Sequence, residues 1–146
     1  MGSSTSKKFW LSVILFWIVN SALMNSVYAH EVRPALLQLT ESGEGRWTTV
    51  FKQPQVQGRF LNLKVITNCS STEAIAIYGE TAIQESFELK CEKKLESIKI
   101  EGLDGSLIDT MVTIEWMDGR KNNHLISSAE PVLQLKGESP AVPVYL

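Results

Sequence analysis

The chain has 146 residues, of which 44% are hydrophobic and 21% are charged, and its formal net charge is −2. A chain of this length can form one domain with a sizeable core, but not two. It has no basic stripe and no Lys and Arg cluster interleaved with aromatic residues, so we expect no nucleic-acid binding.

The first 29 residues have the layout of a secretory signal peptide. Lys7-Lys8 precede an apolar run over residues 9–19, and small residues precede a cleavage point after Ala29. The run is about a dozen residues, shorter than the roughly 20 that span a bilayer. An uncleaved form that extends the run through residues 22–24 is the alternative. We therefore expect export to the periplasm or another extracytoplasmic space, with His30 as the first mature residue.

After residue 30, short runs of alternating apolar and polar residues are separated by turn-forming clusters, which predicts strands throughout. Pro54 is expected to end the second run. The only segment that approaches a helical pattern is 81–87. The expected strands lie within residues 35–40, 47–52, 60–67, 74–78, 87–91, 98–101, 110–116, 121–126 and 132–135.

The clearest local signal is Asp118-Gly119 between two such runs. This pair tolerates positive φ at both central positions of a tight turn, so it predicts a β-hairpin. Short strands at this spacing predict an all-β fold, an antiparallel two-sheet β-sandwich that is immunoglobulin-like in outline and is preceded by an N-terminal signal helix. A closed barrel is the structural alternative. The expected organisation is a signal peptide at 1–29, the sandwich domain at 30–136 and a Pro-rich tail at 137–146.

Two cysteines, Cys69 and Cys91, lie in the part expected to be exported. An even pair in an oxidising compartment predicts a disulfide, which would stabilise the fold by roughly 3 kcal/mol. Two buried free thiols are the alternative. A cysteine metal site is not expected, because there is no CxxC pair. Asn68-Cys69-Ser70 also fits a glycosylation sequon, which matters only in a cell that glycosylates exported proteins.

Catalytic patterns are absent from the sequence. There is no Gly-rich phosphate loop and no GxSxG, and the only histidines are His30 and His124. Ser127-Ser128 follow His124 closely, but that spacing along a strand or turn does not create a nucleophile and base. The carboxylates are scattered over outward strand positions. We therefore expect no enzyme.

The mature N-terminus is a candidate metal site. His30 would offer a free amine and an imidazole, which together chelate copper or nickel. Glu31 could add an oxygen ligand, and His124 is the sole candidate for a second imidazole. Any export junction that ends in Ala-His creates such a terminus, so the pattern is unspecific.

A set of landmarks runs across the whole of the part expected to be mature. The landmarks are the opening AHEVRPA at residues 29–35, residues 37–41, Trp47, residues 51–54, the cysteine pair, residues 100–103 and Asp118-Gly119. Together they resemble the exported N-terminal region of the HupE/UreJ family of bacterial membrane proteins. In that family a β-rich exported region precedes transmembrane helices, and members are described as hydrogenase or urease accessory proteins and as nickel or other metal permeases.

The chain departs from the family at its C-terminal end, where the sequence PAVPVYL stands about where the membrane helices would begin. Transport therefore cannot be assigned to these residues. The resemblance implies a non-catalytic periplasmic head, cut from a longer membrane protein, that assists metal uptake or binds a partner. Its partner would be the transmembrane region of the same or a neighbouring polypeptide. The alternatives are a free periplasmic copper- or nickel-binding protein that uses His30, and a structural module that interacts through exposed strand edges.

Overall fold

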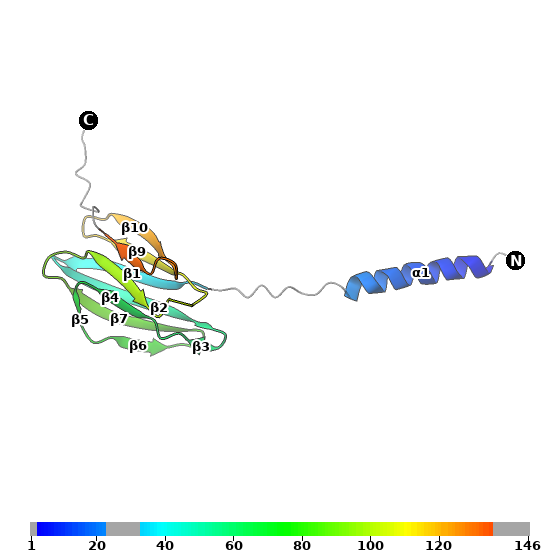
Figure 1. Ribbon diagram of the computed structural model, residues 1–146, viewed down its shortest axis with the longest axis horizontal. Helices are drawn as coiled ribbons and strands as arrows, with labels where there is room; N and C mark the ends of the chain where they lie inside the picture. Colours follow the sequence, from blue (N-terminus) through cyan, green and yellow to red (C-terminus); the bar gives the residue numbers. More distant parts are fainter. Residues whose placement is uncertain (1–2, 23–32, 136–146) are drawn as a thin grey trace, which may run out of the picture. The chain divides into compact units, whose positions relative to one another are not determined.

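A computed structural model describes residues 3–22 and 33–135 of the chain (Figure 1). The chain divides into two compact units, Met1–Glu31 and Val32–Leu146. The first contains one helix, and the second is built from strands in two sheets. The prediction of a mostly β protein with an N-terminal helix is therefore confirmed.

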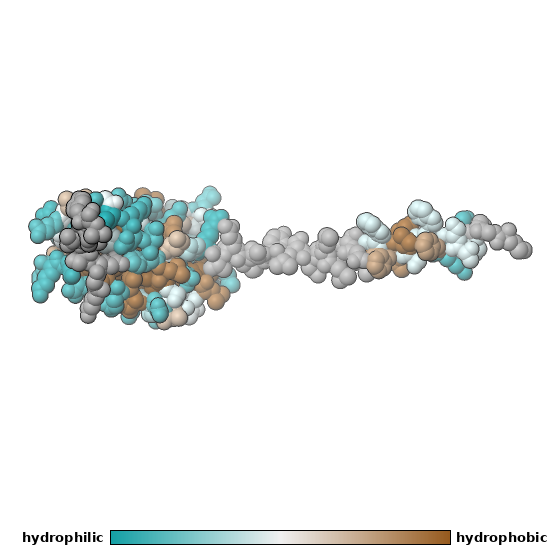
Figure 2. Space-filling model, turned by 90° about the horizontal axis from the view of Figure 1, so that it is seen from above, coloured by the Kyte–Doolittle hydropathy of each residue, from teal (hydrophilic) through white to brown (hydrophobic). Residues whose placement is uncertain are grey.

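Helix α1 covers Ser3–Ala22. It contains no Gly or Pro, and Leu, Trp, Phe and Ile residues dominate its middle. Figure 2 shows apolar residues along it, and Trp10, Phe16 and Trp17 are each exposed by 65% or more. Among the described residues, no helix is long and apolar enough to cross a membrane. The predicted cleavage point after Ala29 lies outside the described residues.

The larger sheet contains eight of the strands in the described part of the chain, and the smaller contains three. The order in the larger sheet is β10-β9-β1-β2-β7-β5, with β3 added to β2 and β6 added to β7, and in the smaller sheet it is β11-β8-β4. The larger sheet is formed by β1 (Ala35–Gly43), β2 (Arg46–Val56), β3 (Arg59–Phe60), β5 (Ser70–Ser71), β6 (Ile75–Tyr78), β7 (Ala82–Lys90), β9 (Thr110–Glu115) and β10 (Lys121–Ile126), and the smaller by β4 (Lys64–Thr67), β8 (Ser97–Glu101) and β11 (Val132–Gln134).

The pairing is not antiparallel everywhere, so the prediction of purely antiparallel sheets is wrong at one place. Strands β1 and β9 are parallel, with Leu37 beside Val112 and Leu39 beside Ile114. Parallel neighbours need a long crossover connection. Here the chain between them passes through β4 and β8 of the smaller sheet before it returns to pair with β1.

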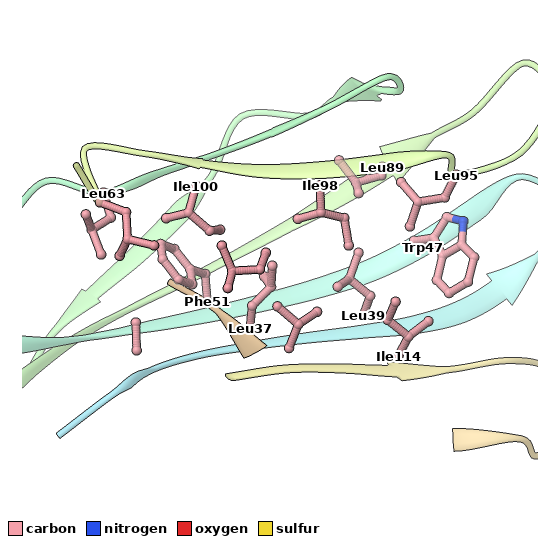
Figure 3. Close-up of a cluster of buried hydrophobic side chains, with 14 of the residues drawn as sticks. Leu37, Leu39, Trp47, Phe51, Leu63, Leu89, Leu95, Ile98, Ile100 and Ile114 are labelled. Carbon is pink, nitrogen blue, oxygen red and sulfur yellow. The ribbon is translucent and has the colours of Figure 1, made fainter. Parts of the chain in front are cut away.

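The buried side chains of both sheets form one hydrophobic cluster (Figure 3). On β1 the alternation places Leu37 and Leu39 in the cluster and leaves Leu36 exposed, as a strand with one buried face requires. Phe51 of β2 is fully buried and lies among side chains from both sheets, including Ile98 and Ile100 of β8. The strands therefore divide between two sheets that share a core, rather than forming the single closed barrel considered above.

Strand β2 continues past Pro54 to Val56, so the prediction that Pro54 ends it is wrong. Pro54 pairs with Ala82, and the next residue donates its N–H to the Thr81 carbonyl at 2.9 Å. Because hydrogen-bonded pairs alternate along an antiparallel ladder, the Pro54 nitrogen points away from β7. On that side β1 has not yet begun, so the missing N–H removes no ladder bond.

Two other predicted segments differ from the structure. The run at 60–67 is divided, because β3 ends at Phe60 in the larger sheet and β4 begins at Lys64 in the smaller one. The segment 81–87, which came nearest to a helical pattern, lies mostly within β7. The three residues between β3 and β4 carry the chain from one sheet to the other.

A buried amide joins the larger sheet to this crossing segment. Gln53 is 3% exposed and projects from β2. Its Nε2 donates to the Leu63 carbonyl and to Glu85 Oε2, and its Oε1 accepts from the Leu63 N–H, each at 2.9 Å. A buried polar side chain costs stability unless it is hydrogen-bonded, and here both ends of the amide are satisfied.

The disulfide prediction is confirmed. Cys69 and Cys91 are bonded, with Cα atoms 4.5 Å apart. Cys69 directly precedes β5 and Cys91 directly follows β7, and these strands pair with Ser70 opposite Lys90, so the bond lies at the end of the β5–β7 ladder in the larger sheet. The Cys91 N–H donates to the Gly45 carbonyl at 2.7 Å. Gly45 has φ +66° and a Cβ there would lie 2.5 Å from the Cys91 carbonyl oxygen, so only glycine fits this turn.

The hairpin predicted at Asp118-Gly119 is confirmed, because β9 and β10 pair with Glu115 opposite Lys121. The turn differs from the expected type. Only Gly119 has a positive φ, +87°, and its N–H donates to the Trp116 carbonyl at 2.9 Å. This is the longer hairpin loop in which a glycine follows a turn of ordinary φ values.

Candidate binding site

Three loops and the residue after β11 enclose a pocket of about 490 Å³ beside the core. The loops are the β1–β2 turn, the β7–β8 loop and the β9–β10 hairpin. They meet because β1 lies between β2 and β9 in the larger sheet, and because the Cys91 N–H at the start of the β7–β8 loop donates to the Gly45 carbonyl in the β1–β2 turn. The lining residues are Glu41, Glu44, Gly45, Trp47, Lys93, Lys94, Leu95, Trp116, Met117, Asp118, Arg120 and Leu135.

Two tryptophans form the aromatic part of this pocket. Trp47 of β2 and Trp116 of the hairpin have ring centroids 6.3 Å apart and planes at 79°, an edge-to-face arrangement. Trp47 is only 5% exposed and belongs to the hydrophobic core, whereas Trp116 is partly buried against it. The pair therefore connects the core to the pocket.

Arg120 covers the outer part of Trp116. Its guanidinium carbon lies 4.9 Å from the ring centroid, a cation–π contact. Its Nε donates to Asp118 Oδ2 at 2.7 Å, and its backbone N–H donates to Asp118 Oδ1 at 3.0 Å. These two bonds, the backbone one foremost, lower the pKa of Asp118 from its usual value of 3.8.

The hairpin loop is also bonded to β1. The Met117 N–H donates to Glu41 Oε2 at 3.0 Å, across 76 positions of sequence. Two of the three carboxylates in the pocket, Glu41 and Asp118, thus bind groups of the protein itself. The bond to Glu41 fixes the hairpin loop against β1.

The pocket lining also includes two lysines of the β7–β8 loop. Within the described part of the chain, the ammonium groups of Lys93 and Lys94 have no ion-pair partner, and both side chains are exposed. Met117 adds an apolar side chain that is 65% exposed. The pocket therefore offers aromatic and aliphatic contact area beside two available positive charges, a combination suited to binding a ligand or a peptide segment.

The predicted metal ligands lie elsewhere. His30 and Glu31 are outside the described residues. His124 lies in β10 opposite Val112, on the side of the sheet that faces the core, and its Nε2 is buried. Among the described residues, no group of three His, Cys, Asp or Glu side chains could hold a metal ion. The three-residue site of His30, Glu31 and His124 stays a prediction.

The pocket itself was not predicted from the sequence. The available signal was the position of Trp116 directly before the hairpin loop, in a chain whose other tryptophan after residue 29 is Trp47. Their proximity depends on the pairing of β1 with both β2 and β9, which is not local in sequence. A comparison with protein-family models found no match, and a comparison with curated proteins found none either.

The bond between Asp118 and Arg120 should persist down to unusually low pH. The pKa of Asp118 is lowered in the folded chain. The stabilisation that the Asp118–Arg120 bond gives the folded chain is therefore complete above about pH 4, and it is lost as the pH falls through the lowered pKa. We expect the NMR resonance of Arg120 Nε–H to stay constant from pH 7 to about pH 4 and to move only below that range. An Asp118→Asn variant should lack this acid transition, and movement centred above pH 5 would contradict the assignment.

Proposed function

We propose that this chain is the exported, non-catalytic head of a membrane protein similar to the HupE/UreJ family, and that it binds a partner at the Trp47–Trp116 pocket. The two sheets would form a β-sandwich, immunoglobulin-like in outline. The partner would be the transmembrane region of the same or a neighbouring polypeptide, and the process assisted would be uptake of a metal such as nickel. The pocket is the observation that carries this proposal.

The disulfide supports export. Such bonds persist in the periplasm and outside the cell and are rare where thiols are kept reduced. Cys69 and Cys91 are bonded in this structure, beside the paired strands β5 and β7. Helix α1, which carries the predicted signal sequence, agrees with the same route.

The composition of the pocket supports binding rather than chemistry. Aromatic, aliphatic and arginine side chains make up the high-affinity centres of many protein interfaces. Here Trp116, Arg120 and Met117 of the hairpin line the pocket together with Lys93 and Lys94 of the β7–β8 loop. Glu41 and Asp118 already bond the hairpin loop, which favours an organic or protein partner over a bare metal ion at this position.

Nickel accumulation by the native host tests this proposal. Deletion of the gene should lower the nickel content of cells grown at limiting nickel, as measured by mass spectrometry of the metal. The native chain should restore it. The Trp116→Ala variant should not restore the nickel content, because the substitution removes the aromatic centre of the pocket. The control variant Lys99→Ala, at an exposed position on β8, should restore the nickel content fully.

The outcomes separate the parts of the proposal. Restoration by Trp116→Ala, with the disulfide intact and the variant exported, would contradict a role for the pocket. Nickel content unaffected by the deletion would contradict a role in nickel uptake. A chain retained with free thiols in the cytosol would contradict export.

A further inference from the structure

Strand β6 is an unprotected edge of the larger sheet. Ile75, Ile77 and Tyr78 are exposed by 72%, 62% and 74%, the highest values for apolar residues in any strand of the described part of the chain. Within residues 33–135, β6 pairs with β7 alone, and its other side carries no strand (Figure 1). Soluble proteins usually protect such edges with lysine, proline or a bulge, and β6 has none of these.

The register shows which backbone groups the free edge offers. Gly79 donates its N–H to the Ala82 carbonyl at 2.9 Å, so these two residues form a hydrogen-bonded pair. Such pairs alternate with non-bonded pairs along an antiparallel ladder. Ala76, opposite Glu85, and Tyr78, opposite Ile83, are therefore non-bonded positions, whose N–H and C=O groups point away from β7. An added strand could pair with both residues.

The charged residues close to β6 in the sequence are of one sign. From residue 65 to residue 89 the sequence contains four glutamates and no lysine or arginine. Glu73 and Glu80 lie on either side of β6, both exposed and without an ion-pair partner among the described residues. A strand added here would place its two ends near these carboxylates, so basic ends are favoured and acidic ends are disfavoured.

The same charges argue against a second copy of this chain as the occupant. An antiparallel pairing of β6 with itself about a two-fold axis, made through these free groups, would place Ala76 opposite the second copy's Tyr78 and Ile77 opposite the second copy's Ile77. In that register Glu80 would lie opposite the second copy's Ala74, one position from its Glu73, and the same would hold at the other end. Two pairs of like charges would thus be brought close together, which disfavours this pairing.

We propose that β6 binds an extended segment of another protein as an added strand, and that this segment has alternating apolar residues between lysines or arginines. Backbone bonds to Ala76 and Tyr78 would supply the pairing. The apolar residues would cover Ile75 and Ile77, which share one face of the sheet, and the basic ends would meet Glu73 and Glu80. This surface is distinct from the tryptophan pocket, so the inference stands independently of the function proposed there.

Fluorescence anisotropy with labelled synthetic peptides tests the proposal, using the oxidised full chain in the detergent that its apolar helix needs. One peptide has alternating valine and threonine between pairs of lysines, and the other has the same core between pairs of glutamates. We expect the lysine-flanked peptide to bind about threefold to tenfold more tightly at low salt, with a difference that shrinks at 1 M salt. Equal binding of the two peptides would overturn the charge argument.

Two pairs of variants locate the site. Ala76→Pro removes a donor at the free edge but no bond to β7, and it should weaken binding at least about tenfold, whereas Ala76→Val keeps the donor and should bind as the native chain does. The double variant Glu73→Lys/Glu80→Lys should bind the glutamate-flanked peptide more tightly than the lysine-flanked one. The control double variant Glu101→Lys/Glu130→Lys changes two exposed glutamates elsewhere and should still prefer the lysine-flanked peptide. Unchanged binding by Ala76→Pro would overturn the proposal. So would a native dimer in sedimentation that Ala76→Pro converts to monomer.

Discussion

Replacement of Phe51 by alanine is expected to lower the free energy of unfolding by about 3–5 kcal/mol. Phe51 is fully buried and is the largest such side chain in the described part of the chain. It lies on β2, which pairs with both β1 and β7, and its ring is in the cluster that includes side chains of the smaller sheet. Alanine would leave a cavity that neither neighbour can fill, because both are fixed by ladder bonds.

Urea unfolding of the oxidised chain, followed by circular dichroism, measures this loss. A domain of this size has a total stability of about 5–15 kcal/mol, so Phe51→Ala should bring it close to the limit of folding. Thr48→Ala is the matched control, because Thr48 lies on the same strand with its side chain exposed. The control should change stability by less than about 0.5 kcal/mol. A loss below about 1 kcal/mol for Phe51→Ala would contradict the packing described for the core.

Removal of the disulfide by Cys69→Ser/Cys91→Ser is expected to cost about 3 kcal/mol. The bond joins residues that are 22 positions apart in the sequence. In the chain-entropy account the bond restricts the unfolded chain, so without it the chain loses more conformational entropy when it folds. The bond also lies where Cys91 donates to Gly45, so its loss should loosen the contact between the β1–β2 turn and the β7–β8 loop. Both segments line the tryptophan pocket.

The native chain in reductant provides the comparison for this variant. Reductant should shift the urea midpoint of the native chain to that of the double variant and should leave the variant unchanged. The slope of the free energy against urea should increase slightly, because the open unfolded chain exposes more surface. Equal midpoints for the oxidised chain and the variant would contradict a stabilising role for the bond.

Local sequence signals predicted most strands because alternation and turn residues act over a few positions. They failed where the turn type depends on the strands around it. The tight turn with positive φ at both central residues occurs at Gln57-Gly58, between β2 and β3, and not at Asp118-Gly119. A glutamine with φ +52° is unusual, and nothing in its immediate neighbours marks it out. The pairing of Val56 with Arg59 imposes it.

Features that depend on distant pairing could not be read from the sequence. The parallel pairing of β1 with β9 and the change of sheet between Phe60 and Lys64 both follow from how the complete chain is arranged. The candidate site has the same origin. Trp47 and Trp116 are 69 positions apart and meet because β1 lies between their strands. The sequence instead suggested His30, Glu31 and His124 as a site, because histidine and glutamate side chains can bind metal ions. That suggestion used the residue types and no information on where the residues lie in space.

The amide of Gln53 has a consequence for how firmly the two sheets are aligned. Apolar side chains attract one another almost equally well when the layers slide, since the hydrophobic effect has no direction. An amide that donates and accepts at a single backbone position does not tolerate such sliding. If β2 were displaced by one residue relative to the crossing segment, Lys52 or Pro54 would lie opposite Leu63. The buried N–H and C=O of Leu63 would then lose their hydrogen bonds to Gln53. One polar side chain in a hydrophobic core thus selects a single alignment of the two sheets from the many that hydrophobic contacts alone would allow.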